Sequence, residues 1–268
     1  MRDLGKRNLL GVLVDALDHE AATQRIIDAA VERRALAVSA LAVHGVMTAR
    51  NDPTRQAVLN QLDVLVPDGQ PVRWGLNLLY GTHLREAVRG SDLTLHVLEA
   101  AAKNALPVFF YGSRQEVVDA LVANMQRQFP QLRVAGAEPS RFRTVSLEER
   151  LAIVTRIRDS GARIVFVGLG CPRQEVFVYE LRKQLSMPLI AVGAAFDYLS
   201  GFLPQPPPAI RRAGLEWLWR LGLEPRRLWR RYLLLNPAYL SLLALQAVRI
   251  WTPQVRAGIP SAGSDLEA

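Results

Sequence analysis

The sequence predicts an α/β fold in which a mostly parallel sheet carries helices on both faces. Short apolar, β-branched runs alternate with longer stretches of helical pattern along most of the 268-residue chain. The runs are apolar throughout and do not alternate with polar residues, so both faces of the sheet need cover. Half of the residues are hydrophobic, which is enough for such a core. The expected class is therefore a Rossmann-like α/β domain, followed by a C-terminal helical appendage.

The expected strands follow one another along the chain, each close to a turn signal. They cover residues 9–14, 36–43, 63–66, 107–111, 131–135, 163–168 and 188–193. Helices are expected between them. Their start signals are Asp18, Asp52 ahead of Pro53, and a capping box of Ser146 and Glu149. Gly161 is expected to end the helix that Ser146 begins.

The composition changes at residues 201–212, where GFLPQPPPAIRR holds four prolines. We therefore expect a catalytic domain over 1–200, a Pro-rich connector with a basic helical appendage over 201–256, and a flexible tail over 257–268. The start of the chain has no long apolar run before a cleavage site, so no signal peptide is expected. Cys171 is the single cysteine, which leaves no intrachain disulfide and fits the cytoplasm.

Positive charge is concentrated near the C-terminal end. The net charge is +8, and residues 209–256 hold nine arginines against two glutamates, while the part before them is close to neutral. A basic segment of this kind indicates one anionic surface or ligand that is engaged locally, and not nucleic acid.

The pattern of arginines and apolar residues over 225–235 predicts an amphipathic helix. One side holds Arg226, Arg227, Arg230 and Arg231, and the other holds Leu228, Trp229, Tyr232, Leu233 and Leu235. Pro237 is expected to stop this helix. The uncharged segment that follows is too short to cross a bilayer, so residues 225–251 are expected to lie on an anionic membrane surface. The alternative, that the apolar side packs on the protein's own core or on another subunit, stays open.

Polar residues after the strands form the candidate site, because ligands of such folds bind beyond the carboxyl ends of the strands. Asp68, in Pro-Asp-Gly, is either a turn residue or a general base. Arg173 and Gln174, in GLGCPRQE, either face water or contact a ligand. Gly112 and Gly170 belong to turns that suit a phosphate cradle.

Three further residues have two interpretations each. His44 is a base or a structural histidine, Asp197 caps a helix or touches the ligand, and Cys171 is more readily a wall residue than a nucleophile. The histidines lack metal-ligand spacing, and neither GxGxxG nor a P-loop is present. We therefore expect no metal and no cofactor.

Six stretches together resemble the WecG/TagA/CpsF family of bacterial glycosyltransferases. They read PDGQPV (67–72), VRGSDL (88–93), VFFYGS (108–113), VGLGCPRQE (167–175), VGAAFDYLSG (192–201) and GLEWLWRLGLEPRRLWRRYLL (214–234). Their order and spacing hold over most of the chain.

The resemblance implies an inverting, metal-independent enzyme on the inner face of the cytoplasmic membrane. It would move a sugar from a UDP-sugar, UDP-N-acetylmannosamine or a related one, to an undecaprenyl-diphosphate-linked sugar. The resemblance also implies that Asp68 is the base and that Gln174 contacts the ligand. It implies functional roles for Arg220, Arg227 and Arg230 in the appendage. A homo-oligomer is compatible with the sequence.

The chain departs from the family in three places. Ala40 and Ala42 stand where many members have Thr and Asn, and Ala87 stands where members often have Arg, with Arg85 or Arg89 as possible substitutes. The family's RAP reads QPPP here. Lost polar groups change which sugar hydroxyls find a hydrogen-bond partner, so the identities of the donor and acceptor sugars stay open.

Two other classes of protein also stay open. One is a non-catalytic membrane-associated scaffold, and the other is an NAD-dependent oxidoreductase, which the missing GxGxxG disfavours.

Overall fold

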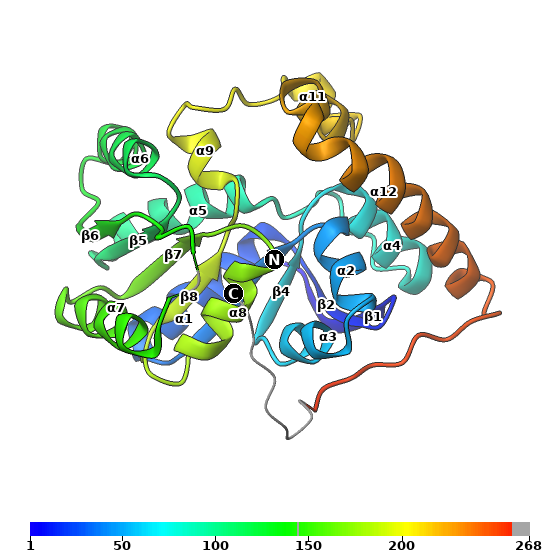
Figure 1. Ribbon diagram of the computed structural model, residues 1–268, viewed down its shortest axis with the longest axis horizontal. Helices are drawn as coiled ribbons and strands as arrows, with labels where there is room; N and C mark the ends of the chain where they lie inside the picture. The colour runs from blue at the N-terminus through cyan, green and yellow to red at the C-terminus, as the bar shows by residue number, and fades with distance from the viewer. Residues whose placement is uncertain (144, 259–268) are drawn as a thin grey trace.

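The computed structural model describes residues 1–143 and 145–258, with the side chains of all of these except Pro208 and Arg231. Its described part contains a six-stranded parallel sheet in the order β4-β3-β8-β7-β5-β6 (Figure 1). The strands are β3 (Leu36–Leu41), β4 (Val64–Pro67), β5 (Val108–Gly112), β6 (Val134–Glu138), β7 (Ile164–Gly168) and β8 (Pro188–Ala191). The predicted α/β class with a parallel sheet is confirmed.

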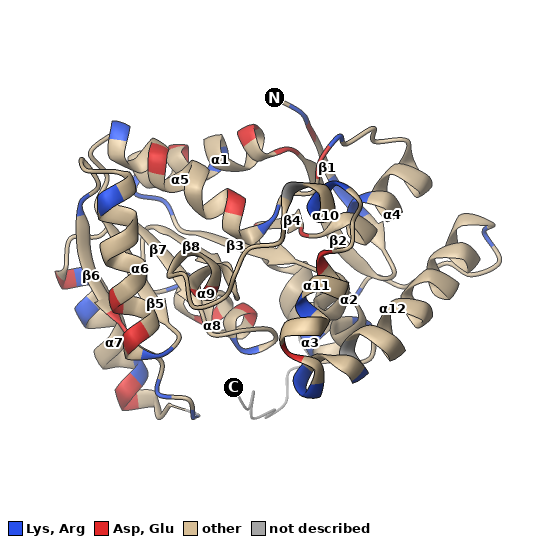
Figure 2. Cartoon of the chain, turned by 90° about the horizontal axis from the view of Figure 1, so that it is seen from above, with Lys and Arg blue, Asp and Glu red and all other residues tan. Residues whose placement is uncertain are grey.

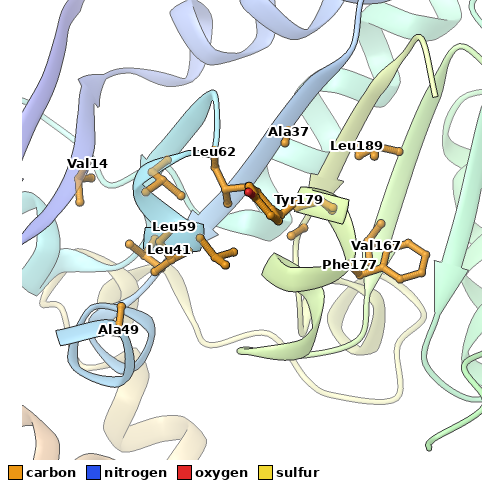
Figure 3. Close-up of a cluster of buried hydrophobic side chains, with 14 of the residues drawn as sticks. Val14, Ala37, Leu41, Ala49, Leu59, Leu62, Val167, Phe177, Tyr179 and Leu189 are labelled. Atoms are coloured by element: carbon orange, nitrogen blue, oxygen red, sulfur yellow. The ribbon is translucent and has the colours of Figure 1, made fainter. Parts of the chain in front are cut away.

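Helices cover both faces of this sheet, as the uniformly apolar strands require. One face packs against α1 (His19–Glu32), α5 (Gly90–Lys103), α6 (Gln115–Gln128) and α9 (Ala195–Leu199). The other packs against α2 (Val43–Arg50), α3 (Pro53–Asn60), α7 (Leu147–Asp159) and α8 (Arg173–Leu181). Figure 3 shows part of this second core, with Val167 and Leu189 of the sheet near Phe177 and Tyr179 of α8.

The predicted helix starts are confirmed. Asp18 accepts from the backbone N–H of Ala21 at 2.9 Å, and Asp52 caps α3 ahead of Pro53. The capping box of α7 is present, with Glu149 N–H donating to Ser146 Oγ at 3.2 Å and Ser146 N–H to the Glu149 carboxylate at 2.9 Å. Gly161, with φ +75°, follows the end of α7 as expected.

The first expected strand is wrong, because residues 9–14 contain a hairpin turn. β1 (Asp3–Leu9) and β2 (Val12–Leu17) pair antiparallel in a separate two-stranded sheet. Leu10 and Gly11 connect them with φ of +55° and +95°, as a two-residue hairpin requires. The apolar run hid this turn, since leucine is rare at positive φ. The strand expected at 131–135 begins three residues later, at Val134.

The appendage consists of α10 (Pro208–Arg212), α11 (Glu216–Leu223) and α12 (Pro225–Ala247). Pro225 lies in the first turn of α12 as expected, but Pro237 does not stop this helix and sits inside it. Proline removes one backbone hydrogen bond, and packing of the following turns compensates. Tyr239 is fully buried, and its hydroxyl donates to Pro71 O at 2.9 Å.

α12 lies along α2 and α4 (Gln70–Tyr80), where Figure 1 shows it descending one side of the molecule. Its protein-facing stripe includes Leu228, Tyr239 and Leu243, all buried. The chain beyond it returns to the hairpin and α3: Asn8, Gln56 and Asn60 donate through side-chain amides to the carbonyls of residues 253, 254 and 256. The appendage is therefore anchored at both ends of α12.

Among the described helices, none is long and apolar enough to cross a membrane. Most of the expected flexible tail, residues 259–268, lies outside the described residues.

Candidate active site

A cavity of about 450 Å³ opens at the carboxyl ends of the parallel strands, where the α/β fold places its ligands. The loops after β3, β4, β5, β7 and β8 form its floor. Eight of the residues predicted from the sequence line it: His44, Asp68, Gly170, Arg173, Gln174, Asp197, Arg220 and Arg227. The fold thus gathers segments that lie far apart in the sequence around one space.

The appendage supplies the opposite wall of this cavity. Glu216, Trp217 and Arg220 of α11, with Arg227 and Tyr232 of α12, line it. Figure 2 shows Lys and Arg positions on α10, both charge signs on α11, and Arg positions only in the first turns of α12. The cavity is therefore enclosed between a sheet edge and a basic helical wall.

Asp68 combines partial burial with a position facing the cavity. Its backbone N–H donates to Leu41 O at 3.2 Å, which fixes the loop after β4 to the end of β3. Burial, with a further contribution from the Glu216 carboxylate, raises the pKa of the Asp68 carboxyl to about 7 against the opposing charges of Arg89 and Arg220. A carboxylate with a pKa near neutrality can accept a proton and release it again at cellular pH, as a general base must.

Arg89 joins α5 to the appendage beside Asp68. Its Nε lies 2.5 Å from Glu216 Oε1, and its Nη1 lies 3.1 Å from the Asp92 carboxylate. Arg211 of α10 reaches the same Asp92 at 3.6 Å. These partly buried ion pairs hold α10 and α11 over the sheet edge. They also set the charges that Asp68 experiences.

Arg220 and Arg227 meet at Glu224. Arg227 Nη2 lies 2.5 Å and Arg220 Nε 3.5 Å from the same carboxylate oxygen. Arg220 also sits over the ring of Tyr198 at 5.8 Å, and burial raises the pKa of that tyrosine to about 12. Two guanidinium groups held together at a cavity wall can bind a diphosphate through several charge-assisted hydrogen bonds.

Gln174 does not face water, so the solvated interpretation of its position is wrong. It is 3% exposed, and its Nε2 donates to Glu175 Oε1 at 2.9 Å. Asp197 does not cap a helix either, because Ala194 occupies the N-cap of α9 and Asp197 lies inside that helix. Burial raises the pKa of the Asp197 carboxyl at the cavity wall.

Two predicted residues lie away from the cavity lining. Gly112 packs against β7 instead, where a Cβ would approach the Gly168 backbone to 2.6 Å, and its neighbours Ser113 and Arg114 line the cavity. Arg230 is exposed on α12, with its guanidinium 5.2 Å from the ring of Trp229. Arg227 lines the cavity and Arg230 does not, although residues three apart are neighbours on a helix surface.

The three alanines noted in the sequence have distinct places. Ala40 and Ala42 line the cavity beside Leu41 and Val43, so the wall after β3 is apolar. Ala87 is fully buried, and Arg89 supplies the guanidinium in this part of the site. Cys171 lines the cavity wall, as expected from its position in the loop after β7.

Sequence reasoning missed the parts of the site that depend on tertiary contact. Glu216, Tyr198 and Trp217 line the cavity, but they were not singled out. One feature of the sequence could have pointed to Glu216, since it is one of two acidic residues among the nine arginines of residues 209–256. Nothing in its spacing indicates Arg89 as its partner.

Comparison with known proteins identifies a family and a curated relative. The family described as Glycosyl transferase WecG/TagA/CpsF matches residues 7–252. The chain is also 31% identical, over 194 residues, to a protein of Bacillus spizizenii named N-acetylglucosaminyldiphosphoundecaprenol N-acetyl-beta-D-mannosaminyltransferase. The alignment covers 72% of this chain and 72% of that relative. The family match includes both the sheet and the appendage that encloses the cavity.

Proposed function

The chain belongs to the WecG/TagA/CpsF family of glycosyltransferases, and from that membership we propose that it transfers a sugar from a UDP-sugar to an undecaprenyl-diphosphate-linked sugar. The product would serve the synthesis of a cell-surface polymer or exopolysaccharide. UDP-N-acetylmannosamine or a related UDP-sugar is the proposed donor. The relative's name, which describes N-acetyl-β-D-mannosaminyl transfer to an N-acetylglucosaminyl-diphospho-lipid, supports this choice.

The observation that carries the proposal is the placement of Asp68 opposite Arg220 and Arg227 in one cavity. In the proposed reaction the acceptor hydroxyl oxygen attacks the anomeric carbon while Asp68 takes the hydroxyl proton. The new C–O bond forms as the bond from that carbon to the UDP oxygen breaks, and UDP leaves with the electron pair. A single displacement of this kind inverts the anomeric configuration.

Negative charge grows on the departing diphosphate, and the arginines of the cavity wall are the proposed stabilisers. Arg220 and Arg227 would shift from Glu224 to the diphosphate oxygens, where paired guanidinium groups bind most strongly. The mechanism then requires neither a metal nor a cofactor. An assay with excess EDTA should retain the full rate, and a loss that Mg²⁺ restores would contradict a metal-independent mechanism.

The second proposed partner is the anionic inner face of the cytoplasmic membrane, on which the enzyme would lie as a peripheral protein. α12 has two apolar stripes, and the one with Leu228, Tyr239 and Leu243 packs on the protein itself. Trp229, Leu233 and Leu240 form the other, and each is at least 45% exposed. Arg226 and Arg230 lie along one side of this exposed stripe. Apolar side chains beside arginines suit the headgroup region of a bilayer, next to a lipid-linked acceptor.

A donor panel tests the function. Purified protein is incubated with UDP-N-acetylmannosamine, UDP-N-acetylglucosamine or UDP-glucose, each together with undecaprenyl-diphosphate N-acetylglucosamine in detergent. The mass of the lipid product is then measured by mass spectrometry. The proposal predicts a mass gain of one N-acetylhexosamine with the first donor. No glycosylated lipid with any donor, together with intact vesicle binding, would favour the scaffold alternative.

A further inference from the structure

A group of buried polar side chains lies beneath the cavity, between β3 and the first turn of α8. It consists of Ser39, Gln174 and Glu175, and none is more than 3% exposed. Two donors meet at one oxygen: Ser39 Oγ and Gln174 Nε2 each lie 2.9 Å from Glu175 Oε1. Neither Ser39 nor Glu175 has a role in the transfer described above.

The contact with Glu175 decides which way the Gln174 amide faces. Because Nε2 is bound to the carboxyl oxygen, the carbonyl Oε1 is left for another donor, and the amide lies beside Gly193, where a Cβ would be 3.4 Å from Oε1 and 3.6 Å from Nε2. Oε1 is buried and has no hydrogen-bond partner among the described residues, although Gln174 and Gly193 both line the cavity. A buried acceptor without a donor is costly, and an N–H or O–H of a ligand in the cavity would satisfy it.

We propose that Glu175, held by Ser39, is a positioning residue that turns the Gln174 carbonyl oxygen to the cavity, where this oxygen accepts a hydrogen bond from the transferred sugar. The inference rests on the proposed function and narrows the substrate class. The sugar of the UDP-sugar presents an N–H, as an acetamido group does, or a free hydroxyl at this point. A sugar without a donor there would leave Oε1 unpaired, and sites built in this way reject such analogues strongly.

The burial of Glu175 favours an uncharged carboxyl. Burial raises its pKa, with the hydrogen bonds from Gln174, Ser39 and Cys171 acting in the opposite direction. In an uncharged carboxyl one oxygen is a carbonyl acceptor, and both donors converge on the single oxygen Oε1. Glutamine at position 175 would keep that acceptor in place with the same shape. Leucine is apolar and offers no acceptor, so the two substitutions differ in whether Gln174 Nε2 keeps its partner.

Binding measurements separate positioning from a general structural effect. UDP-N-acetylmannosamine and UDP are titrated into the wild type, Glu175→Gln, Glu175→Leu and Ser39→Ala by calorimetry. Glu175→Leu is expected to weaken the binding of UDP-N-acetylmannosamine about tenfold, which is the effect of losing one well-placed hydrogen bond. Binding of UDP should be unchanged. Glu175→Gln should restore the lost affinity, and Ser39→Ala should show a smaller loss in the same direction. Thermal unfolding of each variant checks that it is folded.

A double-mutant cycle with Gln174→Ala completes the test. If Glu175 acts through Gln174, Glu175→Leu has no further effect on UDP-N-acetylmannosamine binding once Gln174 is alanine. Equal weakening of UDP and the UDP-sugar, no recovery in Glu175→Gln, or additive losses in the cycle would each overturn the inference. A wild-type protein that binds UDP but no UDP-N-acetylhexosamine would instead contradict the proposed function on which the inference stands.

Discussion

At the scale of single residues, the chemistry depends on a carboxyl group whose surroundings hold its pKa near neutrality. Asp68 is surrounded by protein on most sides, and the charges next to it belong to other elements: Glu216 and Arg220 on α11, Asp92 on α5, and Arg89 directly before α5. Glu216 and Asp92 favour the protonated form, and the two arginines favour the ionised form. The appendage therefore tunes the proposed base as well as enclosing it.

The pH dependence of the reaction should report this arrangement. The proposed base acts only when ionised, and the pKa of Asp68 is about 7, so kcat/KM should fall as the pH falls through about 7. Glu216→Gln removes a negative charge and should move this midpoint to lower pH. Arg89→Gln removes a positive charge and should move it to higher pH. Shifts of both variants in the same direction would contradict the assignment.

The raised pKa of Asp68 also makes the stability of the folded protein depend on pH. Protonation of Asp68 is favoured in the folded protein, so this contribution to stability is complete below the unfolded pKa of 3.8 and is lost as the pH rises through about 7. Asp68→Asn should therefore raise the thermal midpoint by roughly a few degrees at pH 8 and leave it unchanged at pH 3.5. Asp119→Asn on the exposed side of α6 should change neither value. A gain for Asp68→Asn that is equal at both pH values would rule out this cause.

At the scale of elements, α12 shows that tertiary packing decides which apolar residues of an amphipathic helix are buried and which stay exposed. Its apolar residues divide into a stripe that packs on α2 and α4 and a stripe that is exposed. The sequence pattern predicted that the arginines and most of the leucines lie on different sides of the helix. It did not predict this second division. Pro237 was expected to end the helix, and packing of Tyr239 and Leu243 beyond it keeps the helix continuous.

The packed stripe predicts a stability effect. Tyr239→Phe removes the hydroxyl that donates to Pro71 O and leaves that carbonyl without this donor, so the free energy of unfolding should fall by about 1 kcal/mol. Tyr80→Phe is the control, because its hydroxyl donates to Asn8 O at an exposed site and its loss should cost less than about 0.5 kcal/mol. Urea unfolding of both variants measures the difference. Equal values would show that the buried contact does not anchor α12.

The exposed stripe predicts membrane binding. Trp229→Gln with Leu233→Gln should reduce sedimentation with vesicles of 30% anionic lipid by about tenfold or more, since each substitution removes apolar area from the interface. Leu151→Gln, an exposed leucine on α7, is the matched control and should bind as the wild type does. Retained binding of the double variant would place the contact elsewhere on the molecule.

At the scale of the whole molecule, the sequence predicts the layers but not the contacts between distant segments. Apolar strands identified the parallel sheet, and polar residues after them identified Asp68 and Gln174 as residues of one cavity. The hairpin was missed because Leu10 takes a backbone conformation that its side chain disfavours. Glu216 and Arg89 were not paired, because an ion pair between residues 127 positions apart in the chain has no periodic signature.

The central claim is that the cavity performs acceptor-dependent sugar transfer with Asp68 as the base. The most direct test is the initial rate of UDP release from UDP-N-acetylmannosamine, with and without undecaprenyl-diphosphate N-acetylglucosamine, for wild type and Asp68→Asn. The account predicts release that requires the acceptor and falls by about 10²–10⁴ in the variant. Release that is independent of the acceptor, or an Asp68→Asn rate within about threefold of wild type, would contradict it.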